Sequence, residues 1–197
     1  SIYKKLEHRV HILHQPSIYV GSMKSTEQEM FVYDETSQQM IKKKIKFVPG
    51  LYKIFDEGVV NMRDHYVRMK DIIEKQHTMI SNKVMIDQKI DINRKYWPVK
   101  MIEITVDNQS NTITLKNSGE GIDVAWHNKE QMYVPELIFG NLLSGANFDE
   151  KEKKTVGGKH GYGAKLINVL STEFIVETVD AYRELKYTQK FSQNMSI

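Results

Sequence analysis

The feature that most restricts the fold is an apolar stripe in the middle of the chain, which predicts one long amphipathic helix beginning at Leu51. Its members recur at steps of three and four residues, and they are Leu51, Ile54, Phe55, Val59, Met62, Tyr66, Met69 and Ile73. At about 100° per residue, the opposite side of this helix carries Glu57, Asn61, Asp64 and Arg68. Gly58 costs about 1 kcal/mol relative to Ala inside a helix, and Asn61 is also a weak helix former. Helix stability alone therefore does not explain Gly58 and Asn61.

Strands and shorter helices are predicted on both sides of this helix. Alternating polar and apolar residues predict a hairpin around 31–33 and 44–48, a second hairpin over 102–106 and 113–115, and two final strands over 173–180 and 186–191. Helical spacing predicts short helices over 1–13, 136–143 and 164–171. Residues 71–98 have no clean period and give no functional interpretation.

Composition limits the classes of protein to consider. At 197 residues and 40% hydrophobic, one domain with a substantial core is expected. No apolar run approaches the roughly 18 residues that a membrane-spanning helix needs, so we expect a soluble protein with no membrane partner. The absence of cysteine excludes disulfides and thiolate metal sites. A net charge of +3, with both signs interspersed, does not by itself indicate nucleic-acid binding.

The segment "GGKHGYGAK" at 157–165 places four glycines immediately before a predicted helix. Backbone N–H groups without a neighbouring Cβ can form a concave site for an anion such as phosphate. A flexible loop would use the same glycines, so both interpretations remain open. The spacing does not fit a Walker loop, and no predicted strand precedes it as a dinucleotide fingerprint requires.

Two further patterns carry candidate chemistry. Glu57 and Asn61 lie four residues apart on one helix face, which suits a general base aimed at a water and an amide that binds Mg²⁺. Asn117 ends a predicted strand with the parity of Ile113 and Leu115, before the glycines of "NSGEG", where its amide could recognise an adenine edge. A solvated helix face and a simple turn are the alternatives.

The order of these three patterns resembles the nucleotide-binding motifs of the GHKL ATPases, which include gyrase, histidine kinases and mismatch-repair MutL. Longer segments are similar to the ATPase region of eukaryotic-type DNA topoisomerase II and cover most of the chain outside about 67–100. These segments are "LEHRVHILHQPSIYVGS", "VPGLYKIFDE", "HNKEQMYVPELIFGNLL", "NFDEKEKKTVGGKHGYGAKLINVLSTEFIVET" and "NMSI".

This resemblance implies an α+β fold, the GHKL or Bergerat two-layer sandwich, in which helices cover one face of a mixed, mainly antiparallel sheet. It also implies that residues 1–197 form one ATPase domain, the N-terminal gate, truncated before its last strand and the transducer domain. The DNA-cleaving tyrosine of the family and its metal-binding carboxylates are not visible in this sequence.

The resemblance also assigns roles to residues. Glu57 would be the general base, Asn61 would coordinate Mg²⁺, Asn117 would bind the adenine amino group, and Lys165 would neutralise charge on the phosphoryl oxygens. The other nucleotide-binding residues that it implies are His65, Ile138, Phe139, Ser144, Asn147, Lys159, His160, Gly161, Tyr162, Gly163 and Ala164. Ile138 and Phe139 would close the apolar side of the pocket.

Several positions depart from the family pattern. Lys159 and His160 stand where the family usually has Arg-Asn, and Gly145 and Ala146 stand where it usually has two serines. His65 occupies a position that is commonly Asn, and the stretch 71–98 is longer than the equivalent linker. These departures indicate a divergent member, from a protist or a large DNA virus.

The function implied is the ATP-binding and hydrolysing gate of a type II DNA topoisomerase, an enzyme that uses ATP and Mg²⁺. ATP would dimerise two copies and trap a DNA duplex for double-strand passage. The alternatives are a nucleotide-binding clamp with weak or no turnover, and a chaperone-like or mismatch-repair GHKL clamp with other partners. By resemblance the protein would act in the nucleus, or in the host cytoplasm or virion if it is viral.

Overall fold

The computed structural model describes residues 6–142 and 163–197 of the chain. The chain divides into two compact units, Ser1–Asp56 and Glu57–Ile197. Within the described residues, no helix combines the length and apolar character that a bilayer crossing requires. The expectation of an α+β class is confirmed, and every strand pair described is antiparallel.

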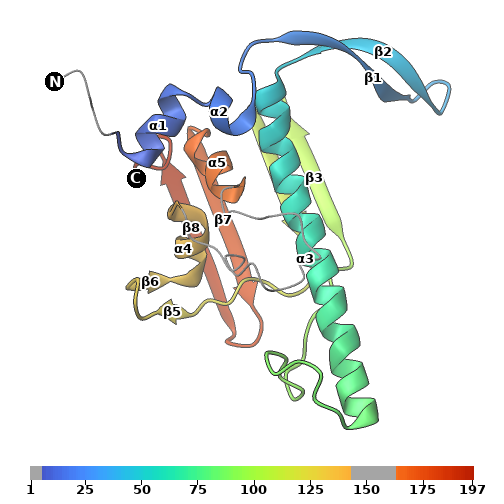
Figure 1. Cartoon of the computed structure of the whole chain (residues 1–197), viewed down its shortest axis with the longest axis vertical. Coiled ribbons are helices and arrows are strands. Elements are labelled where there is room, and N and C mark those ends of the chain that lie inside the picture. Colours follow the sequence, from blue (N-terminus) through green and yellow to red (C-terminus); the bar gives the residue numbers. More distant parts are fainter. Residues whose placement is uncertain (1–5, 143–162) are drawn as a thin grey trace. The chain divides into compact units, whose positions relative to one another are not determined.

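The first unit contains two short helices and a hairpin (Figure 1). Helices α1 (His8–His14) and α2 (Ser17–Val20) bury Ile12 and Val20, and Tyr19 joins them through its hydroxyl, 2.8 Å from Nδ1 of His11. Helix α2 lies beyond the short helix that the sequence predicts over 1–13. Strands β1 (Thr26–Asp34) and β2 (Gln39–Phe47) form the predicted first hairpin, and both are longer than the predicted extended runs.

Helix α3 (Pro49–Asn82) is the long helix that the apolar stripe predicts. Its buried positions include Gly58, Met62, Met69, Gln76 and Met79, at steps of four, seven, seven and three residues, which places them on one side of an α-helix with 3.6 residues per turn. Leu51 and Tyr66 belong to the predicted stripe but are exposed. The helix also continues to Asn82, past the point where the sequence loses its clean period.

Strands β3 (Ile102–Asp107) and β4 (Thr112–Asn117) form the second predicted hairpin, in which Ile104 pairs with Leu115 and Ile102 with Asn117. The close approach of β4 to α3 explains Gly58. A Cβ at this position would lie 2.3 Å from Cδ1 of Leu115, so a side chain here would collide with the hairpin. Gly58 is therefore a packing residue, which accounts for its cost in helix propensity.

The remaining elements form the core of the second unit. They are β5 (Trp126–His127), β6 (Met132–Tyr133), α4 (Val134–Gly140), α5 (Gly163–Val169), β7 (Glu173–Asp180) and β8 (Leu185–Ser192). Helices α4 and α5 contact each other and β7 (Figure 1). Their apolar faces bury Leu166, Val169, Val176 and Phe191. Helix α4 begins two residues before the predicted start and ends at Gly140, because Asn141 takes an extended conformation.

Candidate functional site

Helix α3 presents three candidate polar residues at successive four-residue steps: Glu57, Asn61 and His65. Four residues turn the helix by about 400°, so each side chain lies roughly one turn beyond the last on the same face. Asn61 is exposed, whereas Glu57 and His65 are half-buried. The face that the sequence assigns to chemistry is therefore only partly solvated.

The first residue of α5 lies directly against this face. A Cβ placed on Gly163 would lie 2.4 Å from Oε2 of Glu57 and 3.5 Å from Nδ2 of Asn61. The distance to Asn61 is ordinary van der Waals contact, whereas the distance to Glu57 is too short for a real Cβ, so only glycine leaves the carboxylate where it is. The fold thus brings the end of the glycine-rich segment to the predicted general base and the predicted magnesium ligand, although about 100 residues of chain separate them.

His65 joins the same face to the loop that follows β4. Its Nε2 lies 2.7 Å from the carbonyl oxygen of Glu120, and Nη2 of Arg68 lies 3.0 Å from its Nδ1. A carbonyl only accepts and a guanidinium only donates, so Nε2 of His65 carries the proton and Nδ1 accepts. Burial lowers the pKa of His65, which agrees with a neutral ring. His65 therefore fixes the loop after β4 to the helix.

Asn117 occupies the last position of β4, as the alternation of the sequence predicts. Its side chain is half-buried and its Nδ2 donates to the carbonyl of Ser118 at 3.1 Å. Gly119 then takes a φ of +93°, and a Cβ there would lie 2.6 Å from the carbonyl oxygen of Pro98. This left-handed conformation and close contact require glycine, so the "NSGEG" turn has one defined shape.

Lys165 and Ala164 follow Gly163 in α5. The side chain of Lys165 is only 2% exposed, and burial lowers its pKa from 10.5 to about 8. A bound anion close to the ammonium group would favour its charged form and would raise this pKa. Because Lys165 is buried, binding of an anion beside it would change its protonation.

We expect this burial to make stability depend on pH. The free energy of unfolding should rise as the pH increases from about 8 toward 10.5, because the unfolded chain then still holds the Lys165 proton that the folded chain has released. Below pH 8 both states hold it, and the contribution is constant. Urea unfolding of wild type and Lys165→Met over this range checks the prediction. Equal slopes for the two proteins would contradict it.

Ile138 and Phe139 lie in α4, where the sequence predicts an apolar wall for the pocket. The ring of Phe139 lies 5.9 Å from that of Phe174, and its carbonyl accepts a hydrogen bond from Nδ2 of Asn168 at 3.0 Å. These contacts tie α4 to α5 and β7. The nucleotide-binding role of Ile138 and Phe139 stays a prediction.

The remaining candidates lie outside the described residues: Ser144, Asn147, Lys159, His160, Gly161 and Tyr162. No group of three or more histidine, aspartate or glutamate side chains in the described ranges is arranged to hold a metal ion. A magnesium ion can be held by one or two protein oxygens together with substrate phosphates. Asn61 offers one such oxygen, and its role as a magnesium ligand stays a prediction.

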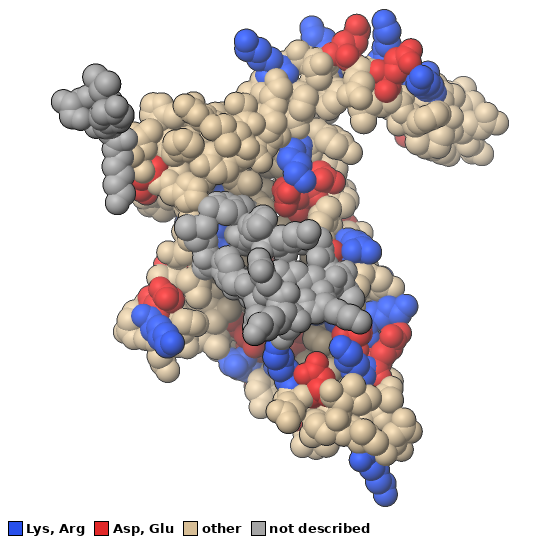
Figure 2. All heavy atoms as spheres, viewed as in Figure 1, with Lys and Arg blue, Asp and Glu red and all other residues tan. Residues whose placement is uncertain are grey.

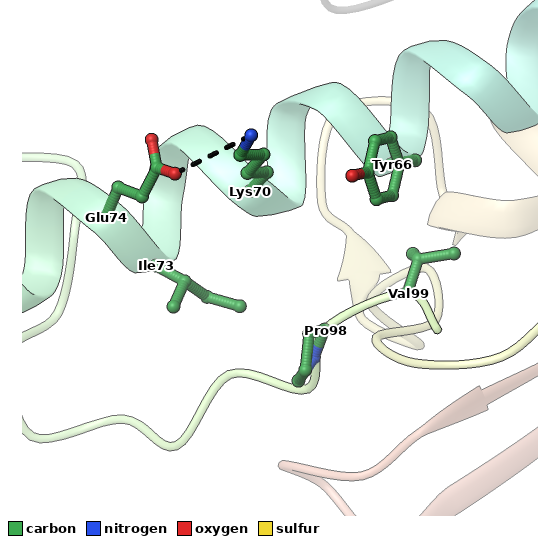
Figure 3. A pocket seen from close by; sticks show the side chains of 6 residues that line it. All are labelled: Tyr66, Lys70, Ile73, Glu74, Pro98 and Val99. Carbon is green, nitrogen blue, oxygen red and sulfur yellow. Dashed lines mark ion pairs between the residues drawn. The ribbon is translucent and has the colours of Figure 1, made fainter. Parts of the chain in front are cut away.

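A separate pocket of about 290 Å³ lies between α3 and the segment before β3 (Figure 3). Its lining residues are Tyr66, Lys70, Ile73, Glu74, Pro98 and Val99, and Lys70 and Glu74 form an ion pair at 3.9 Å. None of the predicted nucleotide-binding residues lines this pocket. On the face shown in Figure 2, acidic and basic side chains of the described residues are intermixed, which agrees with the balanced charge of the sequence.

Glu120 and Arg94, which no sequence pattern singles out, form a buried ion pair beside the turn that follows Asn117. Glu120 is 6% exposed, and its carboxylate accepts a hydrogen bond from Arg94. A carboxylate between two glycines is a weak signal that such a partner exists. The sequence contains nothing that indicates which of its cations is that partner.

No model of a protein family matches the chain. It is 42% identical over 195 residues to DNA topoisomerase 2 of Saccharomyces cerevisiae, covering 99% of this chain and 12% of that protein. DNA topoisomerase 2 of Acanthamoeba polyphaga mimivirus is 38% identical over 197 residues, covering 98% of this chain and 14% of the relative.

Two solved structures resemble the whole chain. The crystal structure of the ATPase region of Saccharomyces cerevisiae topoisomerase II gives a TM-score of 0.82 at 42% identity and covers 100% of this chain and 45% of that one. The ATPase and transducer domains of DNA topoisomerase II from Balamuthia mandrillaris give 0.80 at 40% identity, covering 100% of this chain and 43% of that one. The sandwich fold implied by the sequence is confirmed by these matches.

Proposed function

Because the chain belongs to the DNA topoisomerase II family and matches its ATPase region, we propose that it is the ATP-binding and hydrolysing gate of a type II topoisomerase. The observation that carries the proposal is the contact between Gly163 and the Glu57–Asn61 pair. It unites a carboxylate, an amide and the end of a glycine-rich segment. General-base chemistry beside a phosphate site needs these groups together.

Each residue has a role in the proposed reaction. Glu57 accepts a proton from the water that attacks the terminal phosphate, and the half-buried position of its side chain limits its contact with bulk water. Asn61 and the phosphates hold Mg²⁺, which neutralises phosphate charge when bound. Lys165 adds a positive charge, and the side-chain oxygen of Asn117 accepts a hydrogen bond from the adenine amino group.

Binding of adenine nucleotide is the first test of this function. Isothermal titration of the chain with a non-hydrolysable ATP analogue and Mg²⁺ is expected to show one site per chain. Asn117→Ala is expected to weaken binding roughly tenfold, because it removes the amide that recognises adenine. Asn128→Ala, in the exposed turn between β5 and β6, is the matched control and should leave affinity unchanged. No saturable binding by wild type would contradict the proposal.

Dimerisation is the second part of the proposed function. We propose that ATP binding joins two copies of the protein around a DNA duplex and that hydrolysis separates them. Light scattering of the protein with saturating analogue should report a doubled mass, and an unchanged mass would refute the clamp. The chain spans 12% of the length of its yeast relative, so DNA cleavage and strand passage would need residues beyond those described here. A eukaryotic source would place the enzyme in the nucleus, and a viral source in the host cytoplasm or virion.

A further inference from the structure

The segment 83–98 follows α3, has no interpretation from the sequence, and is attached to that helix by hydrogen bonds. Ile90 is 6% exposed, and the side-chain amide of Gln76 donates to three backbone carbonyls. These carbonyls belong to Asp91 at 3.0 Å, Ile92 at 3.3 Å and Arg94 at 2.7 Å. Gln76 is itself 7% exposed, so its hydrogen bonds are shielded from water. The backbone at Arg94 is therefore held in place by α3.

The guanidinium of Arg94 is oriented by rings and carboxylates together. Its carbon lies 5.2 Å from the ring centroid of Tyr96 and 4.8 Å from that of Tyr182. Its Nη2 donates to Oε1 of Glu120 at 2.5 Å and to Oδ1 of Asp123 at 3.2 Å. The side chains of Arg94 and Glu120 are 15% and 7% exposed. The cost of removing both charges from water offsets much of the attraction between Arg94 and Glu120. We therefore take this buried ion pair as a contact that fixes the positions of the two side chains more than one that adds stability.

Glu120 is fixed through its other polar groups as well. Its Oε2 accepts from the backbone N–H of Trp97 at 3.2 Å, and its own N–H donates to the carbonyl of Trp97 at 2.8 Å. Its carbonyl accepts from His65. Residues 94–98 therefore hold one side of the loop 117–121, and α3 holds the other.

We propose that Arg94 is a positioning residue of the nucleotide site, which sets the place of Asn117 by holding Glu120 in the loop 117–121. The inference rests on the proposed function, because it takes adenine as the ligand of this loop. A loop ordered before the ligand arrives loses less entropy on binding, so removing the Arg94 contact should lower affinity for adenine nucleotides. The phosphate side of the site, at Glu57 and Gly163, makes no contact with Arg94 among the described interactions and should keep its rate.

The test uses steady-state hydrolysis and direct titration with Arg94→Gln. We expect KM for ATP and the dissociation constant to rise about tenfold, while kcat stays within about twofold. The preference for ATP over GTP should fall, because only the base side is loosened. Arg94→Lys keeps one charged donor and should recover part of the affinity. Lys129→Gln, at an exposed residue of the turn between β5 and β6, is the control and should behave as wild type. Unchanged KM and selectivity in Arg94→Gln would overturn the proposal.

Two measurements keep the outcome clear if Arg94→Gln folds poorly. Glu120→Gln preserves side-chain shape and should show the same rise in KM, so a wild-type KM would also overturn the proposal. Hydrogen exchange without nucleotide should be about tenfold faster at the Glu120 amide of Arg94→Lys, with the β7 amides unchanged. This measurement does not involve ATP. Failure of wild type to bind ATP therefore refutes the proposed function, whereas unchanged exchange at Glu120 refutes the role of Arg94 in holding the loop.

Discussion

Glu57→Gln is expected to lower kcat for ATP hydrolysis by about 10²–10⁴-fold, which is the usual contribution of a positioned general base. Glutamine keeps the shape of the side chain but cannot take a proton from water. Nucleotide affinity should change by less than about threefold, because a group that acts only in the transition state contributes little to ground-state binding. Phosphate release under single-turnover conditions, together with titration by a non-hydrolysable analogue, measures the two effects separately.

The matched control is Glu74→Gln, on the same helix. Glu74 is exposed, and its described ion pair, with Lys70 at 3.9 Å, is of the weak surface kind. It should leave both kcat and affinity at wild-type values. If Glu57→Gln and wild type release phosphate at the same rate, the base lies elsewhere. If neither turns over ATP although both bind it, the chain is a nucleotide-binding clamp.

Gly163→Ala is expected to reduce kcat by about ten- to a hundredfold with little loss of stability. The backbone of Gly163 is outside the left-handed region, so alanine can adopt its conformation. Alanine would instead meet Oε2 of Glu57 at 2.4 Å, the mobile end of a flexible side chain that can rotate away. The cost is a misplaced carboxylate, and the melting temperature should remain close to that of wild type.

A double-mutant cycle shows whether this loss passes through Glu57. If Gly163→Ala acts by displacing the carboxylate, adding it to Glu57→Gln should cause little further loss, because the base is already absent. Losses that simply multiply in the double variant would mean that Gly163 acts independently of Glu57.

The hairpins and final strands could be predicted because their signals are local. In β7 the alternation of Val176, Thr178 and Asp180 on the buried face matches the two-residue period of a strand. Two of these buried residues are polar, and their oxygens accept from backbone N–H groups of the segment 122–124 at 2.8 Å. The pattern of the sequence thus gives the element, whereas its polar contacts appear only in the fold.

The end of α3 and the stretch beyond it could not be predicted, because the contacts that fix them join residues far apart in the sequence. Met79 and Ile90 are buried although no continuous apolar period includes them. Gln76 is also buried, and it contacts the segment after α3 through hydrogen bonds, not through an apolar side chain. Arg94 and Glu120 are 26 residues apart and belong to no shared motif. Such long-range polar pairs have no periodic signal in a single sequence.

The residue types of the candidate site could be predicted from the sequence, but their arrangement in space could not. The spacing of Glu57 and Asn61 placed both on one helix face, and the alternation of β4 placed Asn117 at its end. The contact of Gly163 with Glu57 depends on how α5 packs within the second unit. The sequence shows only that position 163 is glycine. The structure shows that the side chain of Glu57 leaves no room for a larger residue.

The most direct test of the account is a structure of the protein with a non-hydrolysable ATP analogue and Mg²⁺. We predict that the terminal phosphate lies at the start of α5, facing the carboxylate of Glu57, with Asn61 on the metal and the adenine ring at Asn117. An analogue bound in the pocket between Tyr66 and Val99, or a terminal phosphate directed away from Glu57, would contradict the central claim.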